Sequence, residues 1–437
     1  MSTGRVLPVD MDELAACVSC GLCLAHCPTF RVTGEESRSP RGRIAAMRAV
    51  EADGMAGPAF REMIDTCVGC RACESACPSS VPFGHLLEAS RRTLAERGVP
   101  WWQRLAYRAL GHHRLLVSLS RLGAVGQRTG LLPARLGARL GLPSLPLRQA
   151  ALEPTGDDVW LFTGCVMDAW QRSVHRDAMA VLASMGVGVA LPGPQAACCG
   201  ALQSHAGLHR QAVRLARRVI AAFPGSAPVL VDSAGCGAAL KEYGYLLDSG
   251  EGERFAARVF DIQEWIAAHA DRLPPPVPGW VPLRVALQDP CHLRHAQRAE
   301  RHVGTVLRPY AVLVELTDEG RCCGAGGAYS VMQPELAGRI RGQKMEVIAA
   351  AQADVVASPN PGCALWLAAA GARVMHPMEI VARAAGLGPS PRQELSQNSR
   401  EGEGGGSSLT NRSHRGEGTS RRLLPPGNSF ATAPQEA

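Results

Sequence analysis

Apolar and polar positions follow a regular order from residue 159 to about residue 385. Short apolar runs rich in valine, leucine and alanine are followed by longer stretches whose apolar positions recur every three to four residues. The short runs predict buried strands, and the longer stretches predict helices that pack on them. Because strands and helices alternate, we expect an α/β region with a mainly parallel sheet.

The predicted elements form two series separated by Pro274-Pro275-Pro276, which we interpret as a linker. The first series has strands at 159–162, 187–190 and 229–232 and helices near 167–185, 208–222 and 238–247. The second series has strands at 284–288, 312–316 and 355–357 and helices near 293–308 and 335–351.

Three further parts flank this region. Within residues 1–100, Ser39-Pro40-Arg41-Gly42-Arg43 opens a helix that is predicted to continue to about residue 51. Residues 101–150 predict an amphipathic helix as far as about residue 122, before glycine and proline break the pattern. Its apolar positions are Leu105, Leu110, Leu115 and Leu119. Residues 389–437 are rich in Ser, Gly, Arg and Glu, and we expect this tail to be disordered.

The formal net charge of +7 is unevenly placed. Between Glu96 and Glu153 there is no acidic residue, while there are nine arginines, more than the net charge of the whole chain. Because this basicity is local, it is poor evidence for nucleic-acid binding, and no nucleic-acid partner is expected. We interpret the stretch as a solvated connector. The alternative is a docking surface for an acidic partner subunit or for anionic lipid headgroups.

Length and composition narrow the class of protein further. The 437 residues suffice for two or three domains, and an apolar content of 46% supports proper cores. No run of eighteen apolar residues occurs, so no membrane-spanning segment is predicted. The N-terminus lacks the pattern of a secretory leader, which favours the cytoplasm. Sixteen cysteines in that compartment indicate metal or redox chemistry.

Eight cysteines form two runs with the spacing C-x2-C-x2-C-x3-C-P, offset by fifty residues. They are Cys17, Cys20, Cys23 and Cys27 before Pro28, and Cys67, Cys70, Cys73 and Cys77 before Pro78. Bacterial ferredoxins hold [4Fe–4S] clusters with this spacing, and the fourth cysteine of each run ligates the cluster of the other. We therefore predict one cluster on Cys17, Cys20, Cys23 and Cys77, and another on Cys67, Cys70, Cys73 and Cys27. Zinc ribbons and a disulfide framework are the weaker alternatives.

The other eight cysteines form two matching sets. The first is Cys165, Cys198, Cys199 and Cys236, and the second is Cys291, Cys322, Cys323 and Cys363. Corresponding positions are 124 to 127 residues apart, which indicates a duplication. The outer cysteines follow predicted strands and the vicinal pairs lie in loops, so four sulfurs can meet at one sheet edge. Each set could hold an iron–sulfur cluster or a zinc ion, and buried structural cysteines are the alternative.

This plan resembles the iron–sulfur subunits of flavin-linked hydroxyacid oxidases, and several stretches look like the glycolate oxidase iron–sulfur subunit. These include Cys27-Pro28-Thr29, residues 39–44, Ser233-Ala234-Gly235-Cys236-Gly237 with Lys241-Glu242-Tyr243-Gly244, Cys291 with His295-Ala296-Gln297, and both Cys-Cys-Gly motifs. The resemblance covers roughly residues 9–385. It also extends to heterodisulfide reductases, whose Cys-Cys-Gly repeats close with C-x2-C. Here Ser233 and Asn360 stand where the first of those two cysteines would be, which counts against disulfide reduction.

The resemblance implies an electron-transfer subunit without catalytic residues of its own. A partner subunit carrying FAD would oxidise glycolate or D-lactate, and electrons would pass through the clusters to a quinone or another acceptor. Such a subunit would be cytoplasmic or peripheral on the cytoplasmic face of the inner membrane. Two alternatives are the iron–sulfur subunit of an anaerobic glycerol-3-phosphate dehydrogenase and a thiol–disulfide enzyme resembling heterodisulfide reductase. Consistent with a relay, no glycine-rich dinucleotide fingerprint follows a predicted strand.

The expected fold is therefore multidomain, with a mainly α, ferredoxin-like N-terminal domain for two [4Fe–4S] clusters and duplicated α/β cysteine-rich domains. We place the cluster domain at residues 1–100 and an arginine-rich helical connector at 101–155. The two cysteine-rich repeats are placed at 156–273 and 281–388, followed by the tail at 389–437.

Overall fold

The structure is a computed structural model that describes residues 6–132, 144–147, 149, 151–193, 196, 198–318 and 320–388. All of these residues belong to one compact unit, Met1–Ser390. The expectation of a disordered tail at 389–437 falls outside the described residues, as does that of a broken pattern at 133–143.

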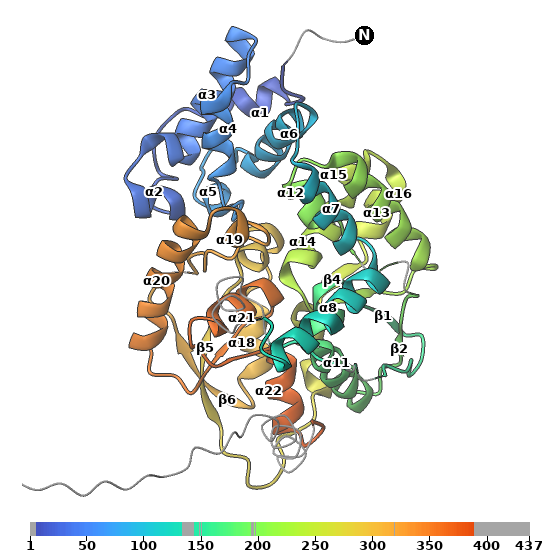
Figure 1. Cartoon of the computed structure of the whole chain (residues 1–437). Coiled ribbons are helices and arrows are strands. Elements are labelled where there is room, and N and C mark those ends of the chain that lie inside the picture. Colours follow the sequence, from blue (N-terminus) through green and yellow to red (C-terminus); the bar gives the residue numbers. More distant parts are fainter. Residues whose placement is uncertain are drawn as a thin grey trace, which may run out of the picture. The chain divides into compact units, whose positions relative to one another are not determined.

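The N-terminal part is built of short helices (Figure 1). They are α1 (Met11–Ala15), α2 (Pro28–Thr33), α3 (Pro40–Asp53), α4 (Pro58–Asp65), α5 (Ala72–Ser75) and α6 (Phe83–Glu96). Proline occupies the start of α2, α3 and α4, where a missing N–H leaves no bond unmade. The Ser39 hydroxyl accepts a hydrogen bond from the Gly42 N–H and caps α3, so the predicted helix at 39–51 is confirmed.

The core of this part includes ligand-run cysteines as well as ordinary apolar residues. Leu14, Met47, Ile64 and Leu86 are fully buried, and Cys67 and Cys73 belong to the same apolar cluster. Small domains whose core contains metal-ligating cysteines usually need the bound metal in order to fold, and this part of the chain has such a core.

The connector forms two helices rather than one, α7 (Trp101–Leu110) and α8 (His113–Arg128). The expectation of a single helix ending near residue 122 was therefore wrong. Gln203 donates a hydrogen bond to the Tyr107 carbonyl and holds α7 in place. Trp170 donates to the Ser120 hydroxyl and holds α8. The chain turns at Gly111 between these two anchors. No helix in the described ranges has the length and apolar character needed to cross a bilayer.

Each cysteine-rich repeat contains a four-stranded, fully parallel sheet. The first has the order β2-β1-β3-β4, and the second has the order β6-β5-β7-β8. The strands are β1 (Val159–Phe162), β2 (Val189–Ala190), β3 (Val229–Val231), β4 (Val259–Asp261), β5 (Leu283–Leu287), β6 (Ala311–Glu315), β7 (Val355–Ala357) and β8 (Val374–Met375). The predicted α/β duplication is present. β4 and β8 were missed.

The helices of the first repeat are shorter and more numerous than predicted. Residues 167–185 are divided at Gln171 into α10 (Val166–Trp170) and α11 (Arg172–Ser184). The remaining helices are α12 (Ala201–His205), α13 (His209–Ala222), α14 (Ala234–Lys241), α15 (Tyr243–Leu247), α16 (Gly250–Ala256) and α17 (Ile262–Ala267). α14 begins directly after β3, so Cys236 lies in its first turn rather than before it.

The helices of the second repeat follow a similar plan. They are α18 (Arg301–Leu307), α19 (Tyr329–Met332), α20 (Pro334–Ala350), α21 (Pro361–Ala368) and α22 (Pro377–Ala384). A π-helical turn, His292–Gln297, precedes α18, which is why the helix predicted near 293–308 starts later. π-Turns are often found at functional sites, and this one begins next to Cys291.

The two repeats share one core. A single apolar cluster joins Leu161 and Ile266 of the first repeat to Val285, Tyr310 and Ile380 of the second. α11 packs on α22, and α17 packs on α18. Because α18 corresponds to α11 and α22 corresponds to α17, these contacts are the two halves of a nearly symmetric arrangement. The repeats are a pair that buries apolar surface together, joined by the Pro274–Pro276 connection.

Candidate metal centres

The two ferredoxin-type runs have the same unusual backbone. Ser19 and Gly21 in the first run, and Gly69 and Arg71 in the second, all have positive φ angles between 58° and 86°. Alternation of left-handed and ordinary residues turns successive N–H groups toward one side, which forms an anion-binding nest. Only glycine takes this conformation without strain, so Ser19 and Arg71 are held in it by the loop.

Two cavities lie beside these runs, and each is lined by cysteines from both. The first cavity is lined by Cys17, Cys20, Cys23 and Cys77, with Cys73 also at its wall. The second is lined by Cys27, Cys67, Cys70 and Cys73. Each cavity thus brings together three cysteines of one run and the fourth cysteine of the other, as the ferredoxin spacing predicts.

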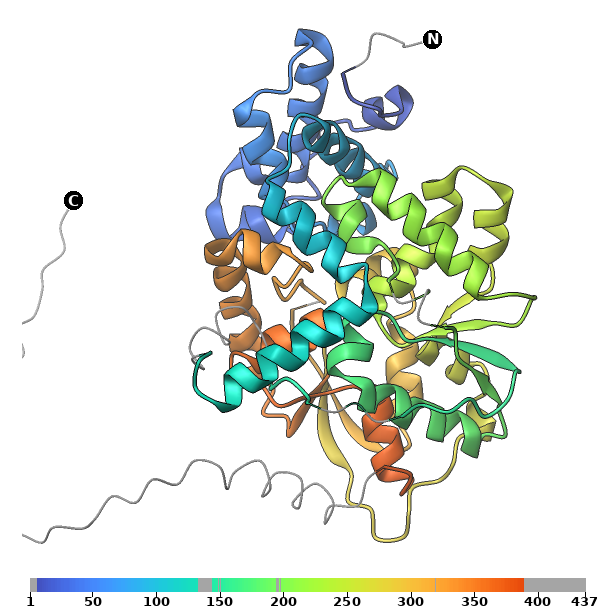
Figure 2. The same cartoon turned by 45° about the vertical axis from the view of Figure 1, so that its right-hand side comes forward.

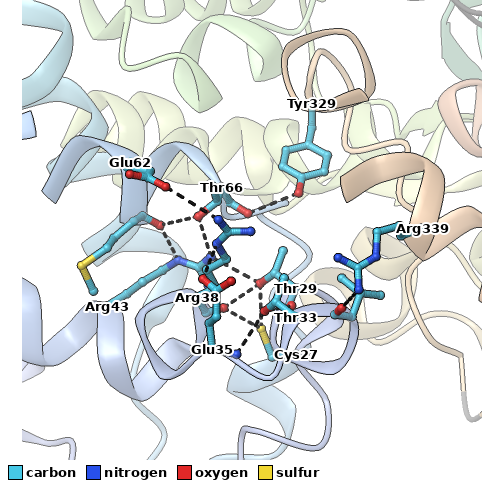
Figure 3. A network of polar contacts seen from close by, with 12 residues as sticks. Cys27, Thr29, Thr33, Glu35, Arg38, Arg43, Glu62, Thr66, Tyr329 and Arg339 are labelled. Carbon is cyan, nitrogen blue, oxygen red and sulfur yellow. Dashed lines mark hydrogen bonds and ion pairs between the residues drawn. The ribbon is translucent and has the colours of Figure 1, made fainter. Parts of the chain in front are cut away.

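A fully buried arginine lines the second cavity (Figure 3). The Arg43 Nε atom donates to the Met63 carbonyl at 2.7 Å, and Nη2 lies 3.3 Å from the hydroxyl oxygens of Thr29 and Thr66. Its Nη1 atom is buried and has no hydrogen-bond partner. A buried guanidinium nitrogen without a partner, beside four thiols and a backbone nest, fits an anionic iron–sulfur cluster in this cavity.

The first repeat gathers its four sulfurs at the carboxyl ends of neighbouring strands. Cys165 follows β1 and Cys236 follows β3, the two strands between which the sheet order reverses. Such a switch point is where open α/β sheets place their sites. The Cys199 and Cys236 sulfurs are 3.3 Å apart, and the thiols of Cys165 and Cys198 hydrogen-bond to each other.

The second repeat has the same pairing of sulfurs. Cys323 and Cys363 have sulfurs 3.1 Å apart, and Cys291 hydrogen-bonds to Cys322. The Asn360 amide nitrogen, at the position of the missing C-x2-C cysteine, lies 3.4 Å from the Cys363 sulfur. The structure therefore places the four predicted cysteines of each repeat at one sheet edge as two pairs.

All sixteen cysteines are free thiols. Within the contacting pairs, hydrogen bonding between sulfurs lowers the pKa of Cys198 and of Cys291 and raises the pKa of Cys165 and of Cys322. In the Cys165–Cys198 and Cys291–Cys322 pairs, one sulfur is thus favoured as the thiolate, the form that binds metal. The sulfurs meet two by two. In the described part of the chain, no three Cys, His, Asp or Glu side chains form the ligand group of a single metal ion.

The second repeat is in direct contact with the ferredoxin-type part. Cys70 and Cys322 belong to one apolar cluster that also contains Cys291 and Cys363, and the nearby Cys291 and Cys70 thiols raise the pKa of Cys322. The Tyr329 hydroxyl donates to the Thr66 carbonyl at 3.3 Å (Figure 3). A cysteine of the second ferredoxin-type cavity and a cysteine of the second repeat are therefore neighbours.

The first repeat has a different cover. Leu116 of α8 packs against Cys165 and Cys198 in a separate small cluster. The Tyr243 hydroxyl donates to the Cys199 carbonyl at 2.8 Å and fixes the vicinal pair from the other side. The helical connector thus shields the sulfurs of the first repeat from solvent, a role beyond that of a solvated linker.

Several residues around the sites were not singled out from the sequence for what they do. Arg43 belongs to the motif used only to predict a helix start, and its burial depends on contacts with residues 20 or more positions away. Arg71 forms ion pairs with Glu74 and with Glu242 of the first repeat. An arginine inside a cysteine run, where its equivalent in the other run is Gly21, was the available signal for Arg71.

Comparison with protein families gives two matches. Residues 13–81 match the 4Fe-4S dicluster domain, and residues 159–241 and 285–368 each match the cysteine-rich domain. The matched ranges include all sixteen cysteines but end before β4 and β8.

Individual relatives cover almost the whole chain. The chain is 33% identical over 399 residues to the "Probable glycolate oxidase iron-sulfur subunit" of Bacillus subtilis (strain 168), an alignment that spans 82% of this chain and 89% of the relative. It is 30% identical over 402 residues to the "Glycolate oxidase iron-sulfur subunit" of Escherichia coli (strain K12), spanning 87% and 96%. The chain belongs to the family of glycolate oxidase iron–sulfur subunits.

Beyond that family, the chain has a more distant likeness to another group. It is 27% identical over 399 residues to a dihydromethanophenazine:CoB–CoM heterodisulfide reductase component of Methanosarcina barkeri (strain Fusaro / DSM 804), spanning 83% of this chain and 90% of the relative. At Ser233 and Asn360 this chain lacks the first cysteine of the C-x2-C motif that closes the repeats of heterodisulfide reductases.

Proposed function

We propose that this chain is the electron-transfer subunit of a flavin-dependent complex that oxidises glycolate or D-lactate. A partner subunit carrying FAD would oxidise the hydroxyacid, and this chain would pass the electrons to a quinone or another acceptor. The observation that carries the proposal is the pair of cavities lined by crossed cysteine sets, in a chain whose relatives at 30–33% identity are glycolate oxidase iron–sulfur subunits.

The ligands would be arranged as two crossed sets. Cys17, Cys20, Cys23 and Cys77 would hold one [4Fe–4S] cluster, and Cys67, Cys70, Cys73 and Cys27 would hold the other. When bound, these clusters supply one-electron transfer. At the first cavity the chain would supply thiolates and the backbone N–H groups around Ser19 and Gly21. At the second it would supply thiolates and the buried Arg43 guanidinium, and each set would stabilise a negatively charged group.

The cysteine-rich repeats would extend the set of metal sites. Each offers four thiols, as many as an iron–sulfur cluster or a zinc ion requires. The packing of Cys70 and Cys322 in one apolar cluster supports a second-repeat site that communicates with the ferredoxin-type centres. Burial of Cys165, Cys198 and Cys199 supports a first-repeat site that excludes water.

The first test is the iron, sulfide and zinc content of the anaerobically purified protein. About eight irons with no zinc would support the ferredoxin-type pair alone, and about sixteen would make all four sites clusters. Zinc in place of iron would overturn the proposal. The substrate is tested with the co-purified flavoprotein, because glycolate or D-lactate should then bleach the cluster absorbance anaerobically. Bleaching by glycerol 3-phosphate only, or reduction of disulfides by the isolated subunit, would favour the alternatives.

The crossed ligand sets make a separate prediction. Cys27→Ser should damage the cluster held by Cys67, Cys70 and Cys73, and Cys77→Ser should damage the one held by the first run. EPR of the reduced protein would show which signal disappears. Loss confined to the run that contains the substitution would contradict the crossed arrangement.

A further inference from the structure

The helices α7 and α8 carry an outward row of large apolar side chains, here called the α7–α8 face. It consists of Trp101, Trp102, Leu105, Leu115, Leu119 and Leu122. Trp101 is 77% exposed and Leu122 is 68% exposed. Both helices are drawn in teal in Figure 2. Isolated exposed apolar residues are ordinary on protein surfaces, but a row along two successive helices marks a surface that another body covers.

The exposed row is not the side that packs on the protein. In α8, Leu116, Ser120 and Ala124 recur every four residues and are buried. Leu115, Leu119 and Leu122 recur at intervals of four and three and lie on the other side of the helix, exposed. The helix is therefore apolar on two faces, one of which covers the first repeat while the other has no cover within the described chain.

The charges beside the row are all of one sign. Arg104, Arg108, Arg114 and Arg121 are exposed and form no ion pair within the described ranges. No acidic residue occurs between Glu96 and Glu153. On α8, Arg114 and Arg121 are seven residues apart, so they lie along one flank of the leucine row.

These features match a lipid surface better than a protein surface. A fluid bilayer conforms to an exposed helical surface and needs no matched groove. Tryptophan favours the headgroup level, and arginine can extend from the edge of an apolar row to lipid phosphates. An acidic partner protein would explain the arginines, but it would require a groove matched to about seven turns of helix bearing leucine and tryptophan.

We propose that the α7–α8 face is a peripheral docking site for an anionic lipid bilayer. The helices lie in the headgroup region, with the apolar row inserted and the arginines on the phosphates. Because Leu116 of the same helix packs on Cys165 and Cys198, the first-repeat sulfurs lie one helix diameter, roughly 10 Å, beneath the docked surface. The proposal does not depend on which hydroxyacid the complex oxidises.

The test uses the full-length, anaerobically purified protein and co-sedimentation with vesicles. Vesicles of phosphatidylglycerol and phosphatidylcholine in equal parts are compared with pure phosphatidylcholine. Wild-type protein should partition onto the anionic vesicles, and salt should weaken the binding. Leu119→Gln/Leu122→Gln should reduce partitioning about tenfold. Arg114→Gln/Arg121→Gln should reduce it roughly fivefold for each arginine and weaken its dependence on salt.

The matched control is Met55→Gln/Val281→Gln, which removes two apolar side chains that are 73% and 77% exposed elsewhere on the chain. It should bind like the wild type, and circular dichroism and iron content should be unchanged in every variant. Equal binding of the wild type to neutral and anionic vesicles would overturn the proposal, as would unchanged binding of both α7–α8 variants. If the wild type ignores vesicles while these variants lose the flavoprotein partner, the face is a protein interface instead.

Discussion

The two cysteine-rich repeats have the same sheet order and the same set of sulfurs, but they have different neighbours. The second repeat presents Cys322 to Cys70 of the ferredoxin-type part, within one apolar cluster. The first repeat presents Cys165 and Cys198 to Leu116 of the helical connector. The difference shows that duplication copies a ligand set, whereas the elements packed against each copy decide what the site can communicate with.

The largest difference between the two repeats is expected when one vicinal cysteine is replaced in each. If the second repeat holds a metal as proposed, Cys323→Ser should remove it and also alter the EPR signal of the adjoining ferredoxin-type cluster, because Cys70 and Cys322 pack in one apolar cluster. Cys199→Ser should remove one site and leave the ferredoxin-type signals unchanged. Metal analysis and EPR of the reduced proteins measure both effects. Equal disturbance by the two variants would show that position relative to Cys70 does not matter.

The next largest effect is expected from a buried ion pair. It holds the loop that precedes Cys322 and Cys323. The Lys344 Nζ atom lies 2.6 Å from Asp318 Oδ2, and both side chains are 3% exposed or less. Lys344→Met should lower the free energy of unfolding by about 3–5 kcal/mol, since it leaves a buried carboxylate without a partner. Lys344→Met/Asp318→Asn should recover part of this loss. Urea unfolding measures both, and a double variant no better than the single one would contradict the explanation.

Truncation of the cover over the first repeat should have a somewhat smaller effect. Leu116→Ala should cost about 2–5 kcal/mol, because it opens a cavity against Cys165 and Cys198. It should also speed the alkylation of these two cysteines, followed by mass spectrometry of the peptides. Leu115→Ala, on the exposed side of the same helix, is the matched control and should change neither quantity. Faster alkylation of the second-repeat cysteines as well would mean general loosening.

The smallest effect concerns the helix that follows the fourth strand of each repeat. Asp261 caps α17 and His376 caps α22, each in a capping box with a glutamate. Burial raises the pKa of Asp261 from 3.8 to about 7 and lowers the pKa of His376 from 6.5 to about 4. Both groups are therefore neutral around pH 5 to 6 in the folded protein.

These shifts act on stability with opposite signs. Between pH 4 and 7 folded Asp261 keeps a proton that the unfolded chain has lost, so its contribution falls as pH rises. Between pH 4 and 6.5 the unfolded chain binds a proton at His376 that the folded protein does not, so its contribution rises with pH. The two slopes offset each other in the wild type.

Single substitutions should separate the slopes. From pH 5 to pH 6, the change in the free energy of unfolding should be more positive than in the wild type for Asp261→Asn and more negative for His376→Asn, by about 1.4 kcal/mol each. Asparagine retains the capping oxygen, so helix capping is preserved. Urea titrations of the wild type and both variants at the two pH values provide the measurement. Shifts from the wild-type slope in the same direction in both variants would contradict the assignment.

Much of the α/β fold could be predicted because its strands are short apolar runs, of which β3 and β7 are buried throughout. β1, β3, β5, β6 and β7 were expected within one residue at each end. The break at Gln171 and the split between α7 and α8 were not, because they depend on what each helix packs against. No local sequence pattern predicts the common core of the two repeats, because Leu161 and Ile380 come together only in the folded chain.

The candidate sites divide in the same way. Cysteine spacing carries its geometry in the sequence, so the sets that line the two cavities and the two sheet edges could be named in advance. The residues around them could not. Arg43 contacts residues from two other helices and loops, and the contact of Cys70 with Cys322 joins positions more than 250 residues apart. Such neighbours are created by packing and have no periodic signature.

Asn360 links the two halves of the duplication. Its amide nitrogen lies 3.4 Å from the Cys363 sulfur, and its carbonyl oxygen accepts a hydrogen bond from the Gly235 N–H of the other repeat at 3.0 Å. A thiol at this position could not make both contacts. Replacement by cysteine would therefore remove a contact to the neighbouring repeat as well as change its own site. The identity of residue 360 thus affects both halves of the duplication at once.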